Sequence, residues 1–259
     1  MNQEERRRFL IEELLRERLS CRRQEIPADT DRQKVLLRSL MNVRHPGAIS
    51  QRFLEVQDAY LQGELAAKKI TRLSELSPLQ NGIYLWRGDI TTLDCGAIVN
   101  AANSGMTGCY QPCHNCIDNC IHTFAGVQLR LKCAEIMEQQ GYKEPTGQAK
   151  ITPAYNLPCD YVIHTVGPIV RGELTRQHCE LLKSCYRSCL ELADENNVGS
   201  IAFCCISTGI FMFPNDRAAE IAVQTVQEYK AETGSKIEVV FNVFKEQDER
   251  IYRKLLSAD

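Results

Sequence analysis

The spacing of hydrophobic residues changes near residue 77 and divides the chain into two parts. Before that point, apolar side chains recur at helical spacing, as in the stripe of Val35, Leu36, Leu40 and Met41. This spacing is typical of amphipathic helices, and proline-containing breaks separate one helical stretch from the next. We therefore predict that residues 1–76 form a helical N-terminal extension and that residues 77–259 form the main domain.

Beyond residue 77, short β-type runs alternate with longer helical patterns. The expected strands cover residues 82–87, 97–100, 148–154, 161–166, 200–205 and 237–243. The expected helices cover residues 117–140, 178–196, 216–231 and 246–256. Strands that alternate with helices of this length predict an α/β fold, in which helices cover both faces of a sheet. In such folds ligands bind beyond the ends of the strands, where loops and helix N-termini meet.

Composition and charge exclude several classes of partner. Lys and Arg number 31 against 33 Asp and Glu, so no overall basic field favours nucleic acid. No apolar run approaches the roughly 20 residues that span a bilayer, and the charged N-terminal stretch lacks the apolar core of a signal peptide. The number of cysteines, 13, is odd, which argues against a full set of disulfides. We expect a cytoplasmic protein with no membrane partner and no nucleic-acid partner.

The first loop with candidate chemistry, RGDITTLDCGAIVNAANSGMTGC, spans residues 87–109. Asp89 follows a glycine at the end of an expected strand, where a buried carboxylate can accept an N–H from the edge of a base. Asn100 and Asn103 flank two alanines after the next strand, and small residues there let a sugar approach closely. The alternative is that Asp89 caps a helical turn and that both asparagines hold turns.

The second loop, ISTGIFMFPNDRAAEIA, spans residues 206–222 and leads from a strand into a helix. Backbone N–H groups in a glycine-containing loop of this kind can bind an anion without a lysine. Phe211 and Phe213 are placed to flank a base or a ribose. The alternative is an ordinary strand-to-helix turn whose aromatic residues belong to the core.

Together, the segments GDIT, AIVNAANS and STGIF, in this order, resemble the signature motifs of macrodomains, and the similarity covers roughly residues 80–255. The resemblance implies a three-layer α/β/α sandwich with a mixed, mostly parallel sheet that binds ADP-ribose. It also implies that Asp89 binds the adenine amino group beside the backbone of Ile90, and that Asn103 holds the distal ribose. The residues implied to wrap the diphosphate and the distal ribose are Ser207, Thr208, Gly209, Ile210 and Phe211.

The third loop, GCYQPCHNCIDNCIHTFAG at residues 108–126, lacks the glycine run that follows the asparagine loop in most macrodomain hydrolases. Its potential soft ligands are Cys109, Cys113, His114, Cys116, Cys120 and His122. Thiolates and imidazoles gathered in one loop of a protein with free thiols are typical ligands of zinc. We therefore predict a metal site here, whereas His122 and the strand residue His164 are expected to be structural.

This loop resembles that of the zinc-containing macrodomains, bacterial and fungal protein-ADP-ribose hydrolases that are often linked to a sirtuin. The resemblance implies that Cys109, His114 and Cys116 bind one Zn²⁺ per chain. Three protein ligands leave a fourth tetrahedral position for water or a substrate oxygen, as in catalytic zinc sites. A structural site would be closed by a fourth protein ligand, which Cys113 or Cys120 could supply.

Two residues near this loop are the catalytic candidates. Asn103 would hold the distal ribose at the bond that breaks. Asp118 falls where the glycine-loop hydrolases place an acidic residue, so it could orient a water molecule as a general base. The alternative for Asp118 is that its charge only favours the N-terminus of a helix.

The resemblance implies a zinc-assisted hydrolase that removes mono-ADP-ribose from Asp or Glu side chains of modified proteins and releases ADP-ribose. Two alternatives use the same pocket. One is a non-catalytic module that binds ADP-ribose, and the other is a deacetylase of O-acetyl-ADP-ribose. The expected partner is an ADP-ribosylated protein, and the sirtuin-linked members of the family make a lipoyl-carrier protein one candidate.

Overall fold

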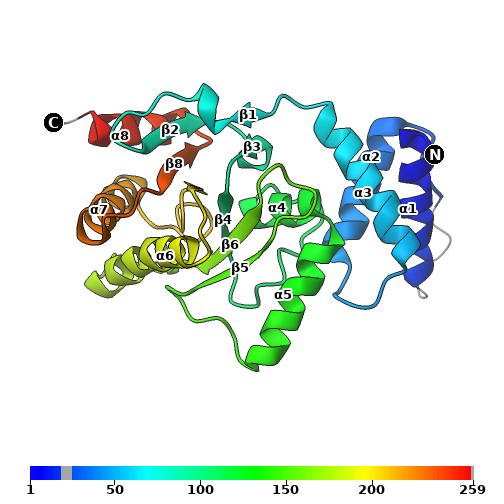
Figure 1. Ribbon diagram of the computed structural model, residues 1–259. Helices are drawn as coiled ribbons and strands as arrows, with labels where there is room; N and C mark the ends of the chain where they lie inside the picture. Colours follow the sequence, from blue (N-terminus) through cyan, green and yellow to red (C-terminus); the bar gives the residue numbers. More distant parts are fainter. Residues whose placement is uncertain (19–24, 258–259) are drawn as a thin grey trace.

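Helices form the N-terminal part of the chain in the computed structural model, which describes residues 1–18 and 25–257 (Figure 1). They are α1 (Gln3–Glu17), α2 (Thr30–Val43) and α3 (Gln51–Ala66). Each begins after a polar residue, Asn2, Asp29 or Ser50, whose side chain accepts a hydrogen bond from a backbone amide of the first turn. The prediction of N-terminal helices is therefore confirmed.

The apolar faces of these helices pack into a hydrophobic core of their own. Its buried members are Leu10, Ile11, Leu14, Leu37, Leu40, Met41, Phe53, Val56, Tyr60, Leu61 and Val127. Val127 stands at the start of a later helix, and the other members come from α1, α2 and α3. The helical extension therefore meets the rest of the molecule largely through polar residues.

The rest of the described chain surrounds a mixed sheet, which has six strands over residues 1–18 and 25–257. In sheet order they are β2 (Ile83–Arg87), β8 (Glu238–Val243), β7 (Ser200–Phe203), β4 (Ala97–Ala102), β6 (Tyr161–Val166) and β5 (Ala149–Pro153). Neighbours are parallel except for β5, which is antiparallel to β6. Outside this sheet lie the short paired strands β1 (Thr71–Arg72) and β3 (Leu93–Asp94) and the 3-10 turns η1 (Leu73–Glu75) and η2 (Ile90–Thr92).

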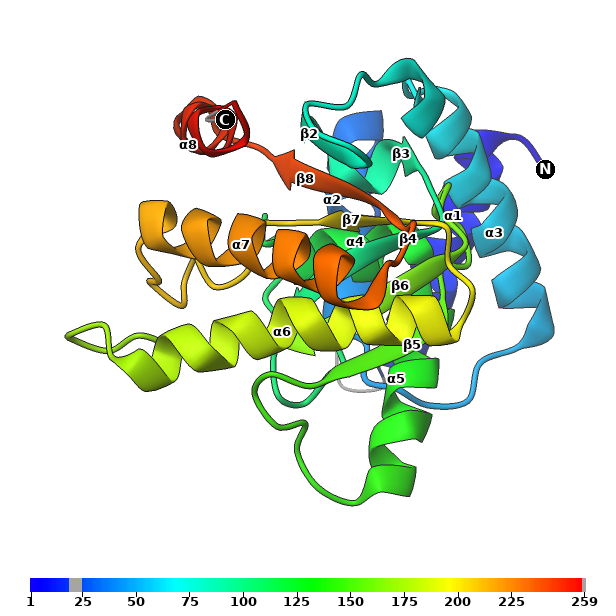
Figure 2. The same ribbon diagram turned by 60° about the vertical axis from the view of Figure 1, so that its left-hand side comes forward.

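Helices cover both faces of the sheet. They are α4 (Ile117–Ala125), α5 (Val127–Gln140), α6 (Arg176–Glu195), α7 (Asn215–Thr233) and α8 (Glu246–Leu256). Asn100 of β4 and His164 of β6 are neighbours in register and contact α4 and α5, respectively. Thr165, the next residue of β6, faces Cys185 of α6, and α6 packs beside α7 (Figure 2). This arrangement confirms the predicted α/β fold with a mixed, mostly parallel sheet.

The helix expected over residues 117–140 is interrupted at Gly126, which ends α4 and begins α5. Its φ is 98°, a left-handed value that favours glycine, and a Cβ there would lie 2.6 Å from Nε2 of Gln57 in α3. Oε1 of Gln57 also accepts the backbone N–H of Val127 at 2.9 Å. The prediction of one continuous helix was therefore wrong, because a side chain of the N-terminal helices occupies the break.

The main hydrophobic core lies between the sheet and its helices. Its largest fully buried side chains include Tyr186, Phe203, Phe213 and Phe241. Such a core provides a rigid base for the loops that follow the carboxyl ends of the parallel strands, where α/β folds place their ligands. In the described part of the chain, no helix combines the length and the apolar character needed to cross a bilayer.

Candidate active site and metal centre

The structure brings together three side chains of the loop between β4 and α4. The ligand atoms of Cys109, His114 and Cys116 all lie within 4.8 Å of one another, and Sγ of Cys109 is 3.6 Å from Nδ1 of His114. Tetrahedral zinc with its usual bond lengths places a sulfur and a nitrogen ligand about 3.6 Å apart. The donor set and its spacing therefore fit a zinc ion.

Cys113 and Cys120, the two possible fourth ligands, point away from this group. Sγ of Cys113 lies 3.5 Å from the carbonyl oxygen of Val35 in α2. Sγ of Cys120 lies 3.6 Å from Nη2 of Arg38, also in α2. Within the described residues, the group of close ligand atoms contains neither of these two cysteines. The geometry thus favours a site with three protein ligands.

Cys116 is also the residue that caps α4, and its Sγ accepts the backbone N–H of Asn119 at 3.4 Å. Burial, with smaller contributions from Cys109 and Asp118, raises the pKa of Cys116 to about 12 against the opposing effect of that hydrogen bond. A thiol in this environment stays protonated unless a cation compensates its charge. A cation bound beside Cys116 would compensate the charge of its thiolate.

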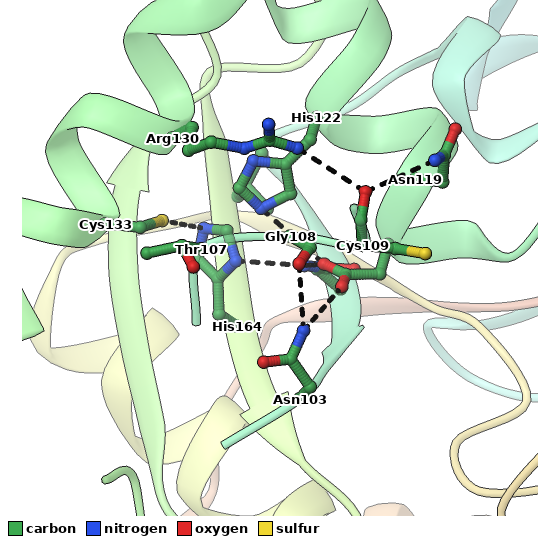
Figure 3. A network of polar contacts seen from close by, with 12 residues as sticks. Asn103, Thr107, Gly108, Cys109, Asn119, His122, Arg130, Cys133 and His164 are labelled. Carbon is green, nitrogen blue, oxygen red and sulfur yellow. Dashed lines mark hydrogen bonds and ion pairs between the residues drawn. The ribbon is translucent and has the colours of Figure 1, made fainter. Parts of the chain in front are cut away.

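Asp118 lies in the first turn of α4 and links two asparagines. Its carboxylate is 5% exposed; Oδ1 accepts Nδ2 of Asn100 at 2.8 Å and Oδ2 accepts Nδ2 of Asn103 at 3.2 Å. Nδ2 of Asn103 also donates to the carbonyl of Gly108 at 3.1 Å (Figure 3). Burial raises the pKa of Asp118 to about 6, although the hydrogen bonds from the asparagines oppose this. The Asn103 side chain is thus held in part by the backbone of Gly108, which directly precedes Cys109.

His122 lies directly under this loop and is buried. It is 4% exposed, and its Nε2 is 3.6 Å from Oδ1 of Asp118. Gly108 has a φ of 84°, and a Cβ at that position would lie 2.8 Å from Cγ of His122. The loop can therefore approach the imidazole this closely only with glycine at position 108.

A second group of close ligand atoms, His122, Cys133 and His164, belongs to the core. Asn100 donates from Nδ2 to Nδ1 of His164 at 3.1 Å, so the proton of this imidazole resides on Nε2. Nε2 then donates to Oγ1 of Thr152 at 3.0 Å. Because both ring nitrogens of His164 have hydrogen-bond partners, this imidazole is a core residue, as expected, and not a metal ligand.

At the other end of the candidate pocket, Asp89 begins the η2 turn. Its Oδ1 accepts the backbone N–H of Thr91 at 3.0 Å and the Thr91 hydroxyl at 2.6 Å. Its Oδ2 lies 3.8 Å from Nζ of Lys68, and the Asp89 side chain is 44% exposed. Ile90, the next residue, is buried. The expectation of a buried carboxylate was therefore wrong, since one oxygen caps the turn and the other is accessible.

The loop after β7 is anchored to the loop after β6. The N–H of Val170 donates to the carbonyl of Phe211 at 2.9 Å, and a Cβ at Gly167 would lie 2.1 Å from Oγ of Ser207. Ser207 has a φ of 65°, which turns the chain sharply, and Ile210 is 75% exposed. Thr208 and Phe211 are half-buried and Gly209 is exposed.

Phe213 does not flank a ligand, contrary to expectation. It is 1% exposed and belongs to the main core, and its N–H donates to the carbonyl of Ser207 at 3.0 Å. Sequence periodicity could not show which of the two phenylalanines points inward, because the loop is irregular. Phe211 alone stays half-buried at the rim.

Adjacent strands carry these residues to one edge of the sheet. In sheet order, β2 precedes Asp89, β8 precedes Phe244, β7 leads to the loop at Ser207, and β4 leads to Asn103. Phe244 is 78% exposed and was missed in the sequence, although an aromatic residue directly after a strand is a usable signal. A wide surface hollow of about 880 Å³ lies instead at the amino ends of β2 and β8 and contains none of the predicted site residues.

Comparisons with known proteins identify the family of this chain. The Macro domain family profile matches residues 99–222. The protein-ADP-ribose hydrolase of Treponema medium is 63% identical to this chain, over 99% of this chain and 100% of its own length. That of Staphylococcus aureus (strain MSSA476) is 49% identical, over 97% of this chain and 95% of its own length. The Trypanosoma brucei macrodomain in complex with ADP-ribose has a TM-score of 0.66 and 30% identity, over 84% of this chain and 94% of that one. The Oceanobacillus iheyensis macrodomain with ADP has a TM-score of 0.62 and 36% identity, over 70% and 93%. The chain therefore belongs to the macrodomain family, in the same group as these protein-ADP-ribose hydrolases.

Proposed function

We propose that this chain hydrolyses the bond between ADP-ribose and an Asp or Glu side chain of a modified protein, with one zinc ion assisting. One observation carries the proposal: the group of Cys109, His114 and Cys116 adjoins Asn103, which donates to the carbonyl of Gly108. A pocket that only bound a nucleotide would need no thiol and imidazole donors beside the loop that holds its ribose. The relatives named as hydrolases, which match nearly the whole chain, support the same activity.

The nucleotide would bind along the edge of the sheet. Oδ2 of Asp89, which the η2 turn leaves accessible, would accept the adenine amino group beside the backbone of Ile90. Phe244 would stack on the base, because it is exposed at the end of the strand next to that of Asp89. The residues proposed to wrap the diphosphate and the distal ribose with their backbone groups are Ser207, Thr208, Gly209, Ile210 and Phe211.

Asn103 is proposed to orient the distal ribose. Both hydrogens of its amide are engaged, one by Asp118 and one by the carbonyl of Gly108, so its oxygen faces away from them. That oxygen accepts the N–H of Gly105 at 2.9 Å and has a second lone pair for a ribose hydroxyl. Asp118 is proposed to act by positioning Asn103, because its buried carboxylate accepts a hydrogen bond from Nδ2 of Asn103 at 3.2 Å.

Cys109, His114 and Cys116 are the residues proposed to hold the metal. When bound, zinc supplies Lewis acidity, which polarises a substrate oxygen or lowers the pKa of a bound water towards about 7. Holding the ribose at a fixed place beside these ligands lets proximity contribute to the rate. We further propose a lipoyl-carrier protein as the modified partner, on the resemblance to sirtuin-linked members of the family.

The proposal is tested on one preparation of the wild-type chain and of Cys116→Ser. Zinc per chain, affinity for ADP-ribose and release of ADP-ribose from a glutamate-modified carrier protein are measured for both. We expect one zinc per wild-type chain, and a variant that loses zinc and turnover but still binds ADP-ribose. A variant without zinc but with full turnover would refute metal assistance.

The same preparation decides between the alternatives. A wild-type chain that binds ADP-ribose and releases none from any modified protein is a binding module. A chain that cleaves O-acetyl-ADP-ribose and leaves modified proteins intact is a deacetylase. Either result would replace the proposed protein substrate.

A further inference from the structure

The helical extension contacts the metal-binding loop directly, through α2. Nη2 of Arg38 donates to the carbonyl of His114 at 2.8 Å and to Oδ1 of Asn119 at 3.1 Å. His114 is one of the proposed ligands, and Asn119 donates its own amide to the carbonyl of Cys109 at 3.4 Å. One guanidinium of the extension thus connects two of the three ligands, one directly and one through Asn119.

Asn42, one turn further along α2, makes the second contact. Its side chain is 2% exposed; Oδ1 accepts the N–H of Cys113 at 2.9 Å and Nδ2 donates to Oγ1 of Thr123 at 2.8 Å. Cys113 has a φ of 53°, in the left-handed region that residues other than glycine rarely adopt. Asn42 therefore stabilises an unfavourable backbone conformation beside His114.

Arg130 of α5 joins the same contact from the macrodomain side. It donates to the carbonyls of Met41, Asn42 and Arg44 at 3.2, 2.8 and 2.6 Å, where the end of α2 leaves carbonyls unpaired. The same guanidinium donates to the carbonyl of Cys109 at 3.5 Å, opposite Asn119 (Figure 3). The buried guanidinium of Arg130 therefore bridges the end of α2 and the backbone of Cys109, the first of the proposed ligands.

These contacts matter because the ligand loop has no regular structure of its own. Between β4 and α4, no helix or strand element spans residues 103–116, within the residues that the structure describes. The spacing of its ligand atoms therefore depends on contacts with other elements. A loop that must first become ordered binds its metal more weakly than one already held in place.

We propose that α2 holds the metal-binding loop in the conformation that binds zinc, and that Arg38 and Asn42 are positioning residues of the metal site. The inference rests on the proposed zinc-assisted hydrolysis. It gives the extension a role in catalysis beyond packing, exerted through the loop and without contact to ADP-ribose.

The test compares Arg38→Ala and Asn42→Ala with Lys34→Ala in the full-length chain. Lys34 lies on the same helix, but its Nζ pairs with Oε2 of Glu64 in α3 at 2.7 Å. Zinc affinity is measured by competition with a chromophoric chelator, ADP-ribose affinity by calorimetry, and kcat and KM with a modified protein.

We expect Arg38→Ala to weaken zinc binding at least about tenfold, since it removes hydrogen bonds from a charged donor. At limiting zinc its kcat falls while KM and ADP-ribose affinity stay near those of the wild type, and excess zinc restores kcat. Arg38→Lys, which keeps the charge, recovers part of the affinity and also serves if Arg38→Ala fails to fold. Lys34→Ala behaves as the wild type.

Two outcomes would overturn the inference, and they differ. If the wild type holds zinc and hydrolyses its substrate, but Arg38→Ala and Asn42→Ala bind zinc with unchanged affinity, the positioning role is wrong and the proposed function stands. If the wild type binds no zinc, both the metal-assisted function and the positioning role fall.

Discussion

Asp118 and Asn103 are joined by a hydrogen bond of 3.2 Å, although one lies in α4 and the other follows β4. The bond places a buried carboxylate behind the amide that is proposed to hold the distal ribose. It also accounts for the buried position of Asp118, which an acid at a helix N-terminus would not require. This hydrogen bond supports the proposal that Asp118 positions Asn103.

Asn103→Ala is expected to lower kcat on ADP-ribosylated protein by about 100-fold, because misplacing a reacting group by roughly 1 Å costs that much. Zinc content should stay at the wild-type value, since Asn103 is not one of the proposed ligands. Steady-state kinetics and metal analysis of the same sample measure both. Unchanged kcat would remove Asn103 from the reaction.

The raised pKa of Asp118 makes a prediction about stability in the zinc-free protein. The pKa of Asp118 is about 6 in the folded state and 3.8 in an unperturbed side chain, so the folded state binds the proton more tightly than the unfolded state. The stability that the protonated Asp118 carboxyl gives to the folded state is therefore present in full below about pH 4, and it is lost as the pH rises through about 6. Two pKa units correspond to about 3 kcal/mol.

The measurement is the free energy of unfolding between pH 4 and 7 for the wild type and Asp118→Asn. The variant loses an acceptor at every pH, so the slope is compared and not the absolute value. The wild type should lose more stability than the variant as the pH rises across this range. Parallel curves would show that Asp118 does not titrate there.

Cys113→Ser and Cys116→Ser should differ although the two cysteines are three positions apart. Sγ of Cys113 faces the carbonyl of Val35, whereas Sγ of Cys116 belongs to the group with Cys109 and His114. We expect Cys113→Ser to keep one zinc per chain and Cys116→Ser to lose it, as measured by metal analysis after dialysis. Loss of zinc in both would indicate a site closed by four ligands.

Gly108→Ala should disturb the loop more than Gly141→Ala. Both glycines have a positive φ, 84° and 77°, but a Cβ meets His122 only at position 108 and open space at position 141. We expect Gly141→Ala to cost about 1 kcal/mol of unfolding free energy from backbone strain alone, and Gly108→Ala more than that. Chemical denaturation measures the difference, and equal losses would mean that His122 moves aside freely.

Phe244→Ala should weaken ADP-ribose binding by roughly tenfold or more, because stacking on a base contributes about 1–3 kcal/mol. Tyr142→Ala is the matched control, since Tyr142 is also exposed, at 65%, but follows α5. Calorimetry with ADP-ribose compares the two variants. Equal affinities would place the base elsewhere.

The order of strands and helices, the helical N-terminus and the crowding of soft ligands between Cys109 and His122 were all predictable from the sequence. Hydrophobic periodicity reports which face of a regular element is buried, and it needs no knowledge of partners distant in the chain. The break at Gly126 was not predictable, since the periodicity continues through it and the reason for it is Gln57 of α3.

Only the tertiary structure decided which cysteines gather with His114, which phenylalanine of the second loop points inward, and that Arg38 reaches the ligand loop. In an irregular loop the direction of each side chain follows from contacts with other elements and not from spacing. The hydrogen bond between Arg38 and His114 spans 76 positions of sequence, and no local pattern encodes such a pairing. The sequence by itself therefore determined the elements and the chemistry of the loop, and the packing of α2 against that loop decided its geometry.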